Sequence, residues 1–241
     1  MSDPAAIAGA TRRLGPAQRQ AARFLAASQA ETAVVTIFGE IDVGALLTWR
    51  SALAEGPSRP SVSHCVLRAL ALALPQYPAL AAHLHDDVLH FGEGLDIALA
   101  VSLPSGDLIT PVLRGVESMD LAMLTAAARD LAEKARTGGL APGDVRGGHF
   151  TLSNVVGAQV TRWTTPIVPR PQVAILALAG IRDVPAVRER AVTVAKMLPV
   201  SLSFDHRAVN GTEASAFLET LAEVLAHPET LAAPLDGGTA Q

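Results

Sequence analysis

The chain has little cysteine, few aromatic residues and no excess of basic charge. A single cysteine among 241 residues, Cys65, excludes an intrachain disulfide and a cysteine-based zinc cluster. A formal net charge of −4 offers no basic surplus for binding nucleic acid or an anionic membrane. Aromatic residues make up only 4% of the chain while 49% of it is hydrophobic, so Ala, Leu and Val must build the core. This composition indicates a globular protein and not a disordered chain.

Long hydrophobic runs and targeting sequences are also missing. The longest apolar stretches, such as residues 173–181, are shorter than the roughly 20 residues of a membrane-spanning helix. No basic flank leads into an apolar run at the N-terminus, so no signal peptide is expected. Together with the lone cysteine, these absences predict a cytoplasmic protein with no membrane partner.

Neither an internal repeat nor a long linker divides the chain. We therefore expect one folded domain over residues 16–235, with a flexible leader at residues 1–15 and a short tail at residues 236–241. A helix carrying Leu46, Leu47 and Leu53 is expected to begin after Asp42, its predicted N-cap. Apolar periodicity and prolines predict further helices at residues 18–28, 61–74, 118–136 and 212–225.

The strands alternate irregularly with these helices. They are predicted at residues 32–41, 149–155, 172–180 and 198–205, and residues 95–113 form a hairpin around the turn-like segment 104–107. In the last strand, apolar side chains alternate with Ser201 and Ser203, which is typical of a half-buried strand. This order predicts an α+β fold, a large mixed sheet with helices packed on one side.

Three polar residues, Asp205, His206 and Arg207, follow directly after the last predicted strand. Such residues at a strand exit suit a site at the edge of a sheet better than they suit a core. An imidazole can accept a proton near neutral pH, so His206 is a candidate general base, and a turn could return the amide of Asn210 toward it. On these residues alone, a surface or hydrogen-bonded core histidine is the more economical interpretation.

The segment SLSFDHRAVNG, residues 201–211, is one of four that occur together in one protein family. The others are GGHFTLSNV (147–155), TTPIVPRPQVAILALAG (164–180) and GLDIALAVSLPSGDLITPVLR (94–114). In this order and spacing they resemble the catalytic domain of the dihydrolipoamide acyltransferases, the core components of 2-oxoacid dehydrogenase complexes. The resemblance spans residues 18–235 and implies the fold of chloramphenicol acetyltransferase.

The resemblance implies roles for three residues. His206 matches the general base that removes a proton from the acceptor group as it attacks the acyl thioester. Ser153, otherwise read as a strand hydroxyl bonded to backbone, matches the donor to the tetrahedral oxyanion, which is typically worth roughly 3–4 kcal/mol of barrier. Asn210 matches a position that supports the site. In the family the histidine of one subunit meets the serine of its neighbour, so a homotrimer is the expected minimal unit.

Acyl transfer of this kind uses acyl-CoA, expected here to be acetyl-CoA, as a cosubstrate. It needs a base, an oxyanion donor and exclusion of water, with no metal and no tightly bound cofactor. Asp205 and Arg207 are expected to hold the loop, and no CoA-binding residue is identified by the sequence. No G-x-S-x-G elbow, Walker loop or H-E-x-x-H motif supports another chemistry.

A histidine-rich segment, HLHDDVLH, is the remaining candidate site. It brings His83, His85 and His90 close together in a polar loop or at the edge of a hairpin. We expect a solvated segment in preference to a metal site, so no metal ligand is assigned.

Three departures from the family concern the acceptor. The lipoyl and subunit-binding domains of full-length family members are absent from these residues, whose start is expected to be natural. The family has an arginine in its first helix, to which either Arg19 or Arg23 corresponds. In the family a T-x-P-H stretch follows this helix, and this sequence does not match it. Ala81 stands near the position of a usual asparagine. These positions line the acceptor side of the channel in the family.

The departures leave three functions open. The preferred one is a stand-alone O-acetyltransferase that moves an acetyl group from acetyl-CoA to a small-molecule hydroxyl. The acceptor would resemble the intermediates, including carrier-protein-derived ones, of tetronate-type antibiotic pathways. The first alternative is a dihydrolipoyl acyltransferase core served by a lipoyl domain in trans. The second alternative is a catalytically inactive scaffold.

Overall fold

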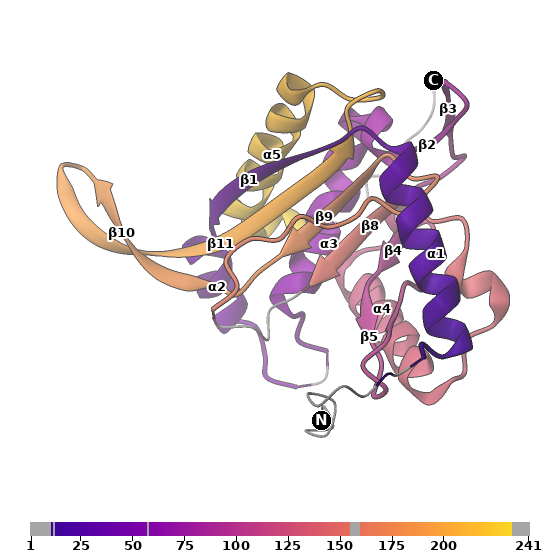
Figure 1. Cartoon of the computed structure of the whole chain (residues 1–241). Helices are drawn as coiled ribbons and strands as arrows, with labels where there is room; N and C mark the ends of the chain where they lie inside the picture. Colours follow the sequence, from indigo (N-terminus) through magenta and orange to yellow (C-terminus); the bar gives the residue numbers. More distant parts are fainter. Residues whose placement is uncertain (1–10, 12, 57, 155–159, 233–241) are drawn as a thin grey trace, which may run out of the picture.

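The centre of the molecule is a seven-stranded mixed sheet. The computed structural model describes residues 11, 13–56, 58–154 and 160–232. The strand order is β1-β11-β9-β8-β4-β7, with β10 paired to β11 (Figure 1). Strand β8 is parallel to β4 and β9, and the other pairs are antiparallel. The strands are β1 (Val34–Asp42), β4 (Ile97–Leu99), β7 (Val112–Leu113), β8 (Phe150–Asn154), β9 (Ala174–Leu178), β10 (Arg182–Arg188) and β11 (Ala191–Asp205).

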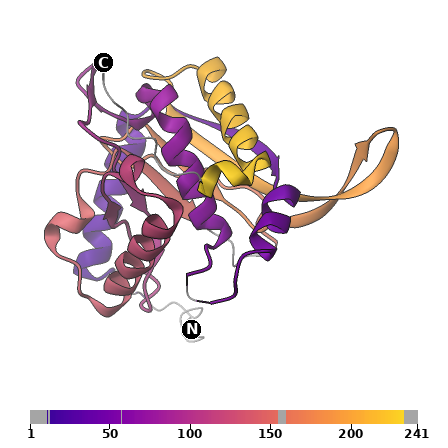
Figure 2. The same ribbon diagram turned by 180° about the vertical axis from the view of Figure 1, so that it is seen from behind.

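Helices cover both faces of the sheet, although unequally. One face carries α2 (Gly44–Ser51), α3 (Val62–Ala73), α4 (Leu121–Thr137) and α5 (Gly211–Ala226), whereas α1 (Pro16–Glu31) lies over the opposite face (Figures 1 and 2). Most of α1 is exposed, and its Ser28 hydroxyl accepts a hydrogen bond from the Arg170 N–H at 3.3 Å. The expectation of helices on one side therefore holds for four helices and not for α1.

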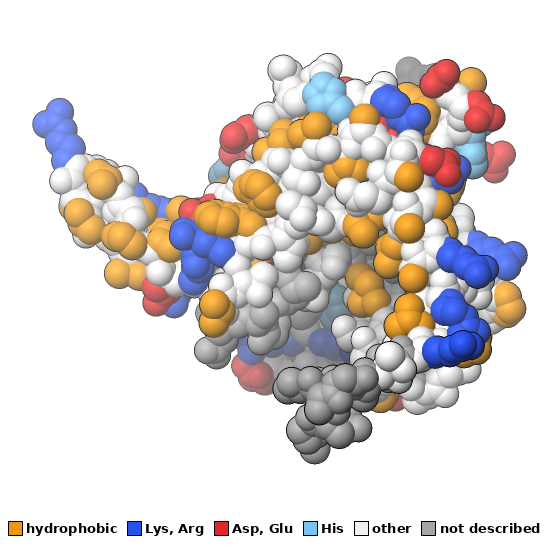
Figure 3. Space-filling view, in the orientation of Figure 1, with side chains coloured by type: hydrophobic (Ala, Val, Ile, Leu, Met, Phe, Trp, Pro, Cys, Tyr) orange, Lys and Arg blue, Asp and Glu red, His pale blue; other side chains and the backbone are white. Residues whose placement is uncertain are grey.

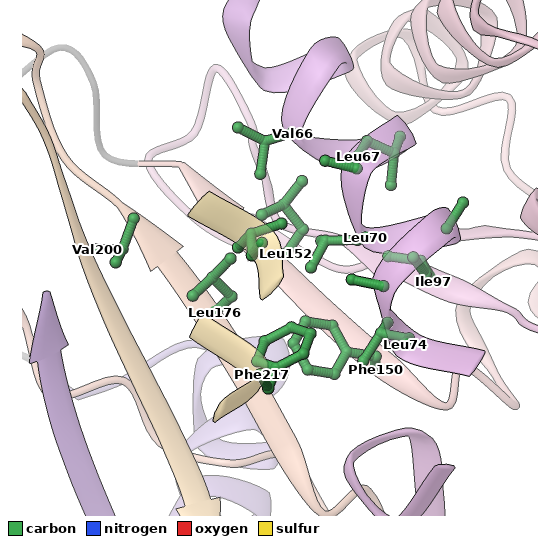
Figure 4. Packing of buried hydrophobic residues seen from close by; sticks show 14 of the residues in the cluster. Val66, Leu67, Leu70, Leu74, Ile97, Phe150, Leu152, Leu176, Val200 and Phe217 are labelled. Atoms are coloured by element: carbon green, nitrogen blue, oxygen red, sulfur yellow. The ribbon is translucent and has the colours of Figure 1, made fainter. Parts of the chain in front are cut away.

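The main core fills the space between the sheet and helices α3 and α5. Leu70 of α3 and Phe217 of α5 meet Phe150, Leu152 and Leu176 of the sheet, and each of these side chains is at most 4% exposed (Figure 4). The rings of Phe150 and Phe217 lie 6.2 Å apart. Burying one such side chain contributes about 1.5–3 kcal/mol. The core therefore fixes the sheet whose ends carry the polar site residues.

Local capping chemistry begins two of the predicted helices. The Ser61 hydroxyl accepts a hydrogen bond from the His64 N–H at 3.2 Å at the start of α3. The Asp120 carboxylate accepts one from the Met123 N–H at 2.7 Å at the start of α4. Each bond satisfies an N–H group that has no partner within its helix. The helices predicted at residues 61–74 and 118–136 are confirmed, and α1 and α5 likewise match their predictions.

The helix predicted after Asp42 differs in its ends. Its N-cap is Val43, and Asp42 is the last residue of β1. The Asp42 Oδ1 nevertheless accepts a hydrogen bond from the Gly44 N–H at 2.9 Å, so the carboxylate still caps the first turn from one residue further back. The helix ends at Ser51, which leaves Leu53 outside it.

The C-terminal half of β11 is buried on both faces, so the expectation of a half-buried strand is wrong. Ser201 is 2% exposed and Ser203 is fully buried. The Ser203 and Thr36 hydroxyls are hydrogen-bonded at 2.7 Å, and the Ser201 hydroxyl accepts a bond from the Thr164 N–H at 3.2 Å. Hydroxyls can enter the interior here because neighbouring segments satisfy them.

The N-terminal half of β11 pairs with β10 in an arm that projects from the body (Figure 1). Hydrophobic side chains lie on this arm, including Val187 and Val192, which are 75% and 76% exposed (Figure 3). Its turn holds Glu189 and Arg190 at φ 49° and 64°, where residues other than glycine are uncommon. The sequence did not predict β10 or this half of β11.

Two two-stranded sheets, β5–β6 and β2–β3, lie outside the main sheet. The hairpin predicted at residues 95–113 is present as two short pairs, β4 with β7 and β5 (Val101–Ser102) with β6 (Leu108–Ile109). The histidine-rich segment forms the other, β2 (Ala82–His85) with β3 (Val88–Phe91). Short 3-10 turns occur at η2 (Leu74–Gln76), η3 (Pro78–Ala81), η4 (Val116–Ser118), η5 (Pro142–Val145) and η6 (Pro228–Ala232).

The ends of the domain are only partly described. Helix α1 begins at Pro16 and η6 ends at Ala232. Most of the predicted leader and all of the predicted tail lie outside the described residues, so both stay predictions. Among the described helices, none is both long and apolar enough to cross a membrane.

Candidate active site

His206 is the first residue after β11, an interior strand, so it lies at an end of the sheet and not at the edge that the sequence predicted. Its backbone N–H donates to the Ala33 carbonyl at 2.9 Å, which holds the strand exit beside the start of β1. The side chain is exposed, and its ring lies 5.8 Å from the buried ring of Phe204. The imidazole is thus fixed at its backbone and open to a reactant at its ring.

The neighbours of His206 form a charge pair that holds this exit. Asp205 is 1% exposed, and its Oδ2 accepts a hydrogen bond from Arg207 Nη2 at 2.6 Å. Its Oδ1 accepts bonds from the N–H groups of Arg207 at 3.1 Å and Ala33 at 3.3 Å. Burial disfavours the charged carboxylate, but the hydrogen bonds from Arg207 outweigh it and lower the pKa of Asp205. The expected loop-holding contact of Asp205 and Arg207 is present.

Asn210 is the N-cap of α5. Its Oδ1 accepts a hydrogen bond from the Glu213 N–H at 2.9 Å. Among the described residues, its amide makes no hydrogen bond to the imidazole of His206, so the expected return of this amide is not observed within one chain. What the contact shows is that Asn210 fixes the start of the helix that follows the His206 loop.

Ser153 lies at the other end of the sheet. It is level with Ala177 of β9, which is in turn level with Ser201 of β11. Strand β11 ends at Asp205, and His206, the next residue, is five residues beyond Ser201. With about 3.3 Å per residue and about 4.8 Å between strands, the backbones of Ser153 and His206 are roughly 19 Å apart. One chain therefore does not bring the predicted base and the predicted oxyanion donor together.

Each end of the sheet borders a cavity. A cavity of about 540 Å³ reaches the His206 exit and is lined in part by Ala33, His85, Arg170, Asp205 and Arg207. At the Ser153 end, cavities of about 770 and 330 Å³ share Ser61, Ser63 and Asn154 as lining residues. Arg50 and Arg182 line the larger of these two cavities, and Arg136 lines the smaller. The Ser153 end is accordingly the more cationic one.

His64 also lines the smaller cavity at the Ser153 end. Its Nδ1 accepts a hydrogen bond from the Ser61 N–H at 3.2 Å, opposite to the bond by which Ser61 caps α3. Burial, with a smaller contribution from Arg129, lowers the pKa of His64 to about 4. The ring is therefore neutral at pH 7. The three-residue spacing of Ser61 and His64 is a capping pattern, and this pattern is the sequence signal for the contact.

No comparable local sequence pattern marks the three arginines that line these cavities. Arg50 lies in the last turn of α2, Arg136 lies in the last turn of α4, and Arg182 begins β10. Nothing in their spacing indicates that they share one end of the sheet. Only the folded chain brings them together.

Comparisons with known proteins agree on one family. The family model described as 2-oxoacid dehydrogenases acyltransferase (catalytic domain) matches residues 8–233. The dihydrolipoyllysine-residue succinyltransferase component of the 2-oxoglutarate dehydrogenase complex of Haemophilus influenzae is 35% identical over 219 residues, 89% of this chain and 53% of that protein. The acetyltransferase component of the pyruvate dehydrogenase complex of Schizosaccharomyces pombe is 37% identical over 181 residues, 74% of this chain and 37% of that protein. The chain spans about half the length of the Haemophilus influenzae protein and less than half the length of the Schizosaccharomyces pombe protein.

Solved structures add the fold. The dihydrolipoamide acetyltransferase of Azotobacter vinelandii, studied for the role of one serine, one histidine and one asparagine in its catalytic mechanism, superposes with a TM-score of 0.86. It is 30% identical and covers 96% of this chain and 98% of its own. Chloramphenicol acetyltransferase is 14% identical with a TM-score of 0.52, covering 84% of this chain and 94% of its own, which is a similarity of fold alone.

Proposed function

Because the chain belongs to the acyltransferase (catalytic domain) family of the 2-oxoacid dehydrogenases, we propose that it transfers an acyl group between CoA and the thiol of a dihydrolipoyl group. The expected family and its chloramphenicol acetyltransferase-like fold are confirmed. One observation carries the proposal. His206 is exposed at a strand exit that the buried Asp205 carboxylate and Arg207 hold in place.

His206 is proposed to act as the general base. A ring nitrogen takes the proton of the attacking thiol, and the sulfur then adds to the thioester carbonyl carbon. The tetrahedral oxyanion accepts a hydrogen bond from the hydroxyl of Ser153. When the carbonyl re-forms, the bond to the leaving sulfur breaks, and the imidazolium returns its proton to that thiolate. The same steps serve either direction of transfer.

A second copy of the chain is proposed to complete the site. Ser153 and His206 of one chain are roughly 19 Å apart, beyond the reach of one tetrahedral intermediate. A ring of copies joined head to tail brings the serine end of one to the histidine end of the next. We propose the homotrimer that the resemblance implies as this ring. Asn210 would support the site by fixing the start of α5 behind the His206 loop.

The CoA cosubstrate is proposed to enter at the Ser153 end. Its phosphate groups are anionic, and three arginines line the two cavities there, Arg50, Arg136 and Arg182. The N-terminus of α3, whose dipole favours negative charge, borders the same cavities through Ser61 and Ser63. No tightly bound cofactor is needed in this scheme.

The acceptor distinguishes this proposal from the small-molecule O-acetyltransferase that the sequence favoured. The two sequence relatives described above are dihydrolipoyllysine acyltransferases of two oxoacid dehydrogenase complexes. Their activity supports the first alternative, a dihydrolipoyl acyltransferase core that is served by a lipoyl domain outside these 241 residues. The acyl group is proposed to be succinyl or acetyl for the same reason. The tetronate acceptor has no such support, and the cytoplasmic location stays a prediction.

An acceptor assay tests the proposal. Succinyl-CoA and acetyl-CoA would each be offered with dihydrolipoamide or with a hydroxymethyl compound, and the acylated product would be identified by mass spectrometry. We expect S-acylated dihydrolipoamide and no ester. Ester formation alone would overturn the proposal in favour of the hydroxyl acceptor. Neither product, together with no binding of either acyl-CoA, would favour the scaffold.

A further inference from the structure

Three histidines share one face of the β2–β3 hairpin. His83 is directly opposite His90 across the two strands, and His83 and His85 are two residues apart on one strand. The ring centres of His85 and His90 are 5.5 Å apart with the planes at 73°, and those of His83 and His85 are 6.4 Å apart. The proposed acyl transfer uses none of these rings.

The three rings differ in their contacts with the rest of the protein. His83 Nε2 is hydrogen-bonded to the Gly148 carbonyl at 2.7 Å, and its ring lies 5.1 Å from that of half-buried His149. His85 and His90 are exposed, and within the described chain neither ring makes a hydrogen bond or an ion pair. Their ring nitrogens are therefore available to a ligand, whereas His83 is tied to the body of the protein.

We propose that His85 and His90 form an open binding site for a divalent transition-metal ion. An imidazole nitrogen binds such an ion at about 2.0–2.1 Å, which puts the centres of two rings sharing it about 5 Å apart. The two rings are already within 0.5 Å or so of that separation. Their nitrogens suit Cu²⁺, Ni²⁺ and Zn²⁺ better than Mg²⁺ or Ca²⁺.

The site is open and not enclosed. In the described part of the chain, no three His, Cys, Asp or Glu side chains are gathered so that they could hold an ion together. Two imidazoles and water molecules would then form the coordination sphere. Such a site follows the general order of affinity for nitrogen ligands, with Cu²⁺ bound more tightly than Ni²⁺ or Zn²⁺.

The charges around the hairpin also favour a cation. Asp86 and Asp87 form the turn between the two histidines, at φ 47° and 62°. The nearby cations are already neutralised, because Arg207 pairs with Asp205 at 2.6 Å and Arg170 pairs with Glu31 at 2.5 Å. The hairpin tip thus offers two carboxylates and no unpaired cation from the neighbouring cavity, to which His85 also belongs.

A titration with Cu²⁺ tests the proposed site directly. Wild type and the variants His85→Gln, His90→Gln and His227→Gln would be titrated with Cu²⁺ and followed by electron paramagnetic resonance. His227 is the matched control, an exposed histidine that pairs with Glu223 and Glu229. We expect one Cu²⁺ with two nitrogen couplings in wild type and in His227→Gln. Either hairpin variant should lose about tenfold or more in affinity, because the second imidazole no longer reaches the same ion.

Two results of the copper titration would overturn the site. One is unchanged copper affinity in the double variant His85→Gln/His90→Gln. The other is an equal loss in His227→Gln, which would indicate scattered surface histidines. A measurement on wild type guards against misfolded variants, since substoichiometric Cu²⁺ should broaden the His85 and His90 imidazole NMR signals before that of His227. Simultaneous broadening of all three signals would also contradict the proposal.

Discussion

The two ends of the central sheet differ in the side chains that they carry and in the cavities beside them. At the His206 end, a buried carboxylate, an arginine and two backbone N–H groups hold the strand exit that carries the exposed His206 ring. At the Ser153 end, the serine sits on a strand beside cavities lined by three arginines. One end has the candidate base without an oxyanion donor, and the other has the donor without a base. The difference teaches that neither end holds both candidate residues, which is why we propose that a second copy of the chain completes the site.

Loss of the imidazole should have the largest effect on activity. We expect His206→Ala to lower kcat by at least about 10²-fold while the protein stays folded, because a positioned general base typically contributes 10²–10⁴. Release of free CoA thiol measures the rate and circular dichroism checks the fold. His227→Ala, at the exposed end of α5, should keep wild-type activity. A His206→Ala protein with full activity would remove the functional distinction between the two ends.

Removal of the serine hydroxyl tests the other end. Ser153→Ala should lower kcat by about 10²–10³-fold, the usual cost of losing one oxyanion donor. Each variant removes the candidate functional group of only one end. Mixing Ser153→Ala with His206→Ala and allowing subunits to exchange should therefore restore part of the activity. Intact sites would then form where the unchanged end of one copy meets the unchanged end of another. No restoration after verified exchange would mean that the two ends do not meet.

The charge pair beside His206 should matter for stability. Arg207→Gln leaves the buried carboxylate of Asp205 without its strongest partner, and we expect a loss of about 1–3 kcal/mol in the free energy of unfolding. Urea denaturation measures it. Arg190→Gln, at the turn of the projecting arm, is the matched control and should change stability by less than about 0.5 kcal/mol. Equal effects of the two changes would show that the pair does not hold the strand exit.

The arginines at the Ser153 end should affect the binding of acyl-CoA and not that of the thiol acceptor. Arg182→Gln is expected to raise KM for acyl-CoA about fivefold, equivalent to an exposed charge contact of about 1 kcal/mol, with little change in kcat. Steady-state kinetics with each substrate varied separately would locate the effect. A rise in KM for the thiol acceptor instead would assign the two cavities the other way round.

Local chemistry explains what the sequence predicted well. Ser61, Asp120 and Asn210 begin helices because their side chains accept a bond from an N–H group three residues on. The motif singles out His206, and the structure places its side chain exposed at the strand exit, while its catalytic role stays a prediction. The first turn of α2 shows the limit of the same rule, since Asp42 caps it from inside β1.

What the sequence missed depends on distant contacts. The burial of Ser201 follows from Thr164, 37 residues away in the chain, and that of Ser203 from Thr36, which is 167 residues away. The projecting arm turns at two charged residues with positive φ, so the glycine or asparagine that usually marks such a turn is absent. The separation of Ser153 from His206 likewise follows from strand order, which no local pattern fixes.

The two ends should also differ in their response to acid, and this is the smallest effect expected. At the His206 end, the lowered pKa of Asp205 gives stability that is present above its unfolded pKa, near 3.8, and lost only as the pH falls through the lower folded value. At the Ser153 end, His64 has a folded pKa of about 4 against 6.5 when unfolded. The unfolded chain binds the extra proton between these values, so stability falls as the pH drops from 6.5 toward 4.

Acidification to pH 5 should therefore weaken the His64 contribution while leaving that of Asp205 intact. We expect His64→Asn, whose amide cannot titrate but can still accept the Ser61 N–H bond, to lose less Tm than wild type between pH 7 and pH 5. The difference should be about 2–4 °C, which corresponds to about 1 kcal/mol in a chain of this length. His227→Asn should follow wild type, since its ring is exposed beside two glutamates. Parallel Tm curves for wild type and His64→Asn would mean that the neutral ring of His64 is not what makes the Ser153 end acid-sensitive.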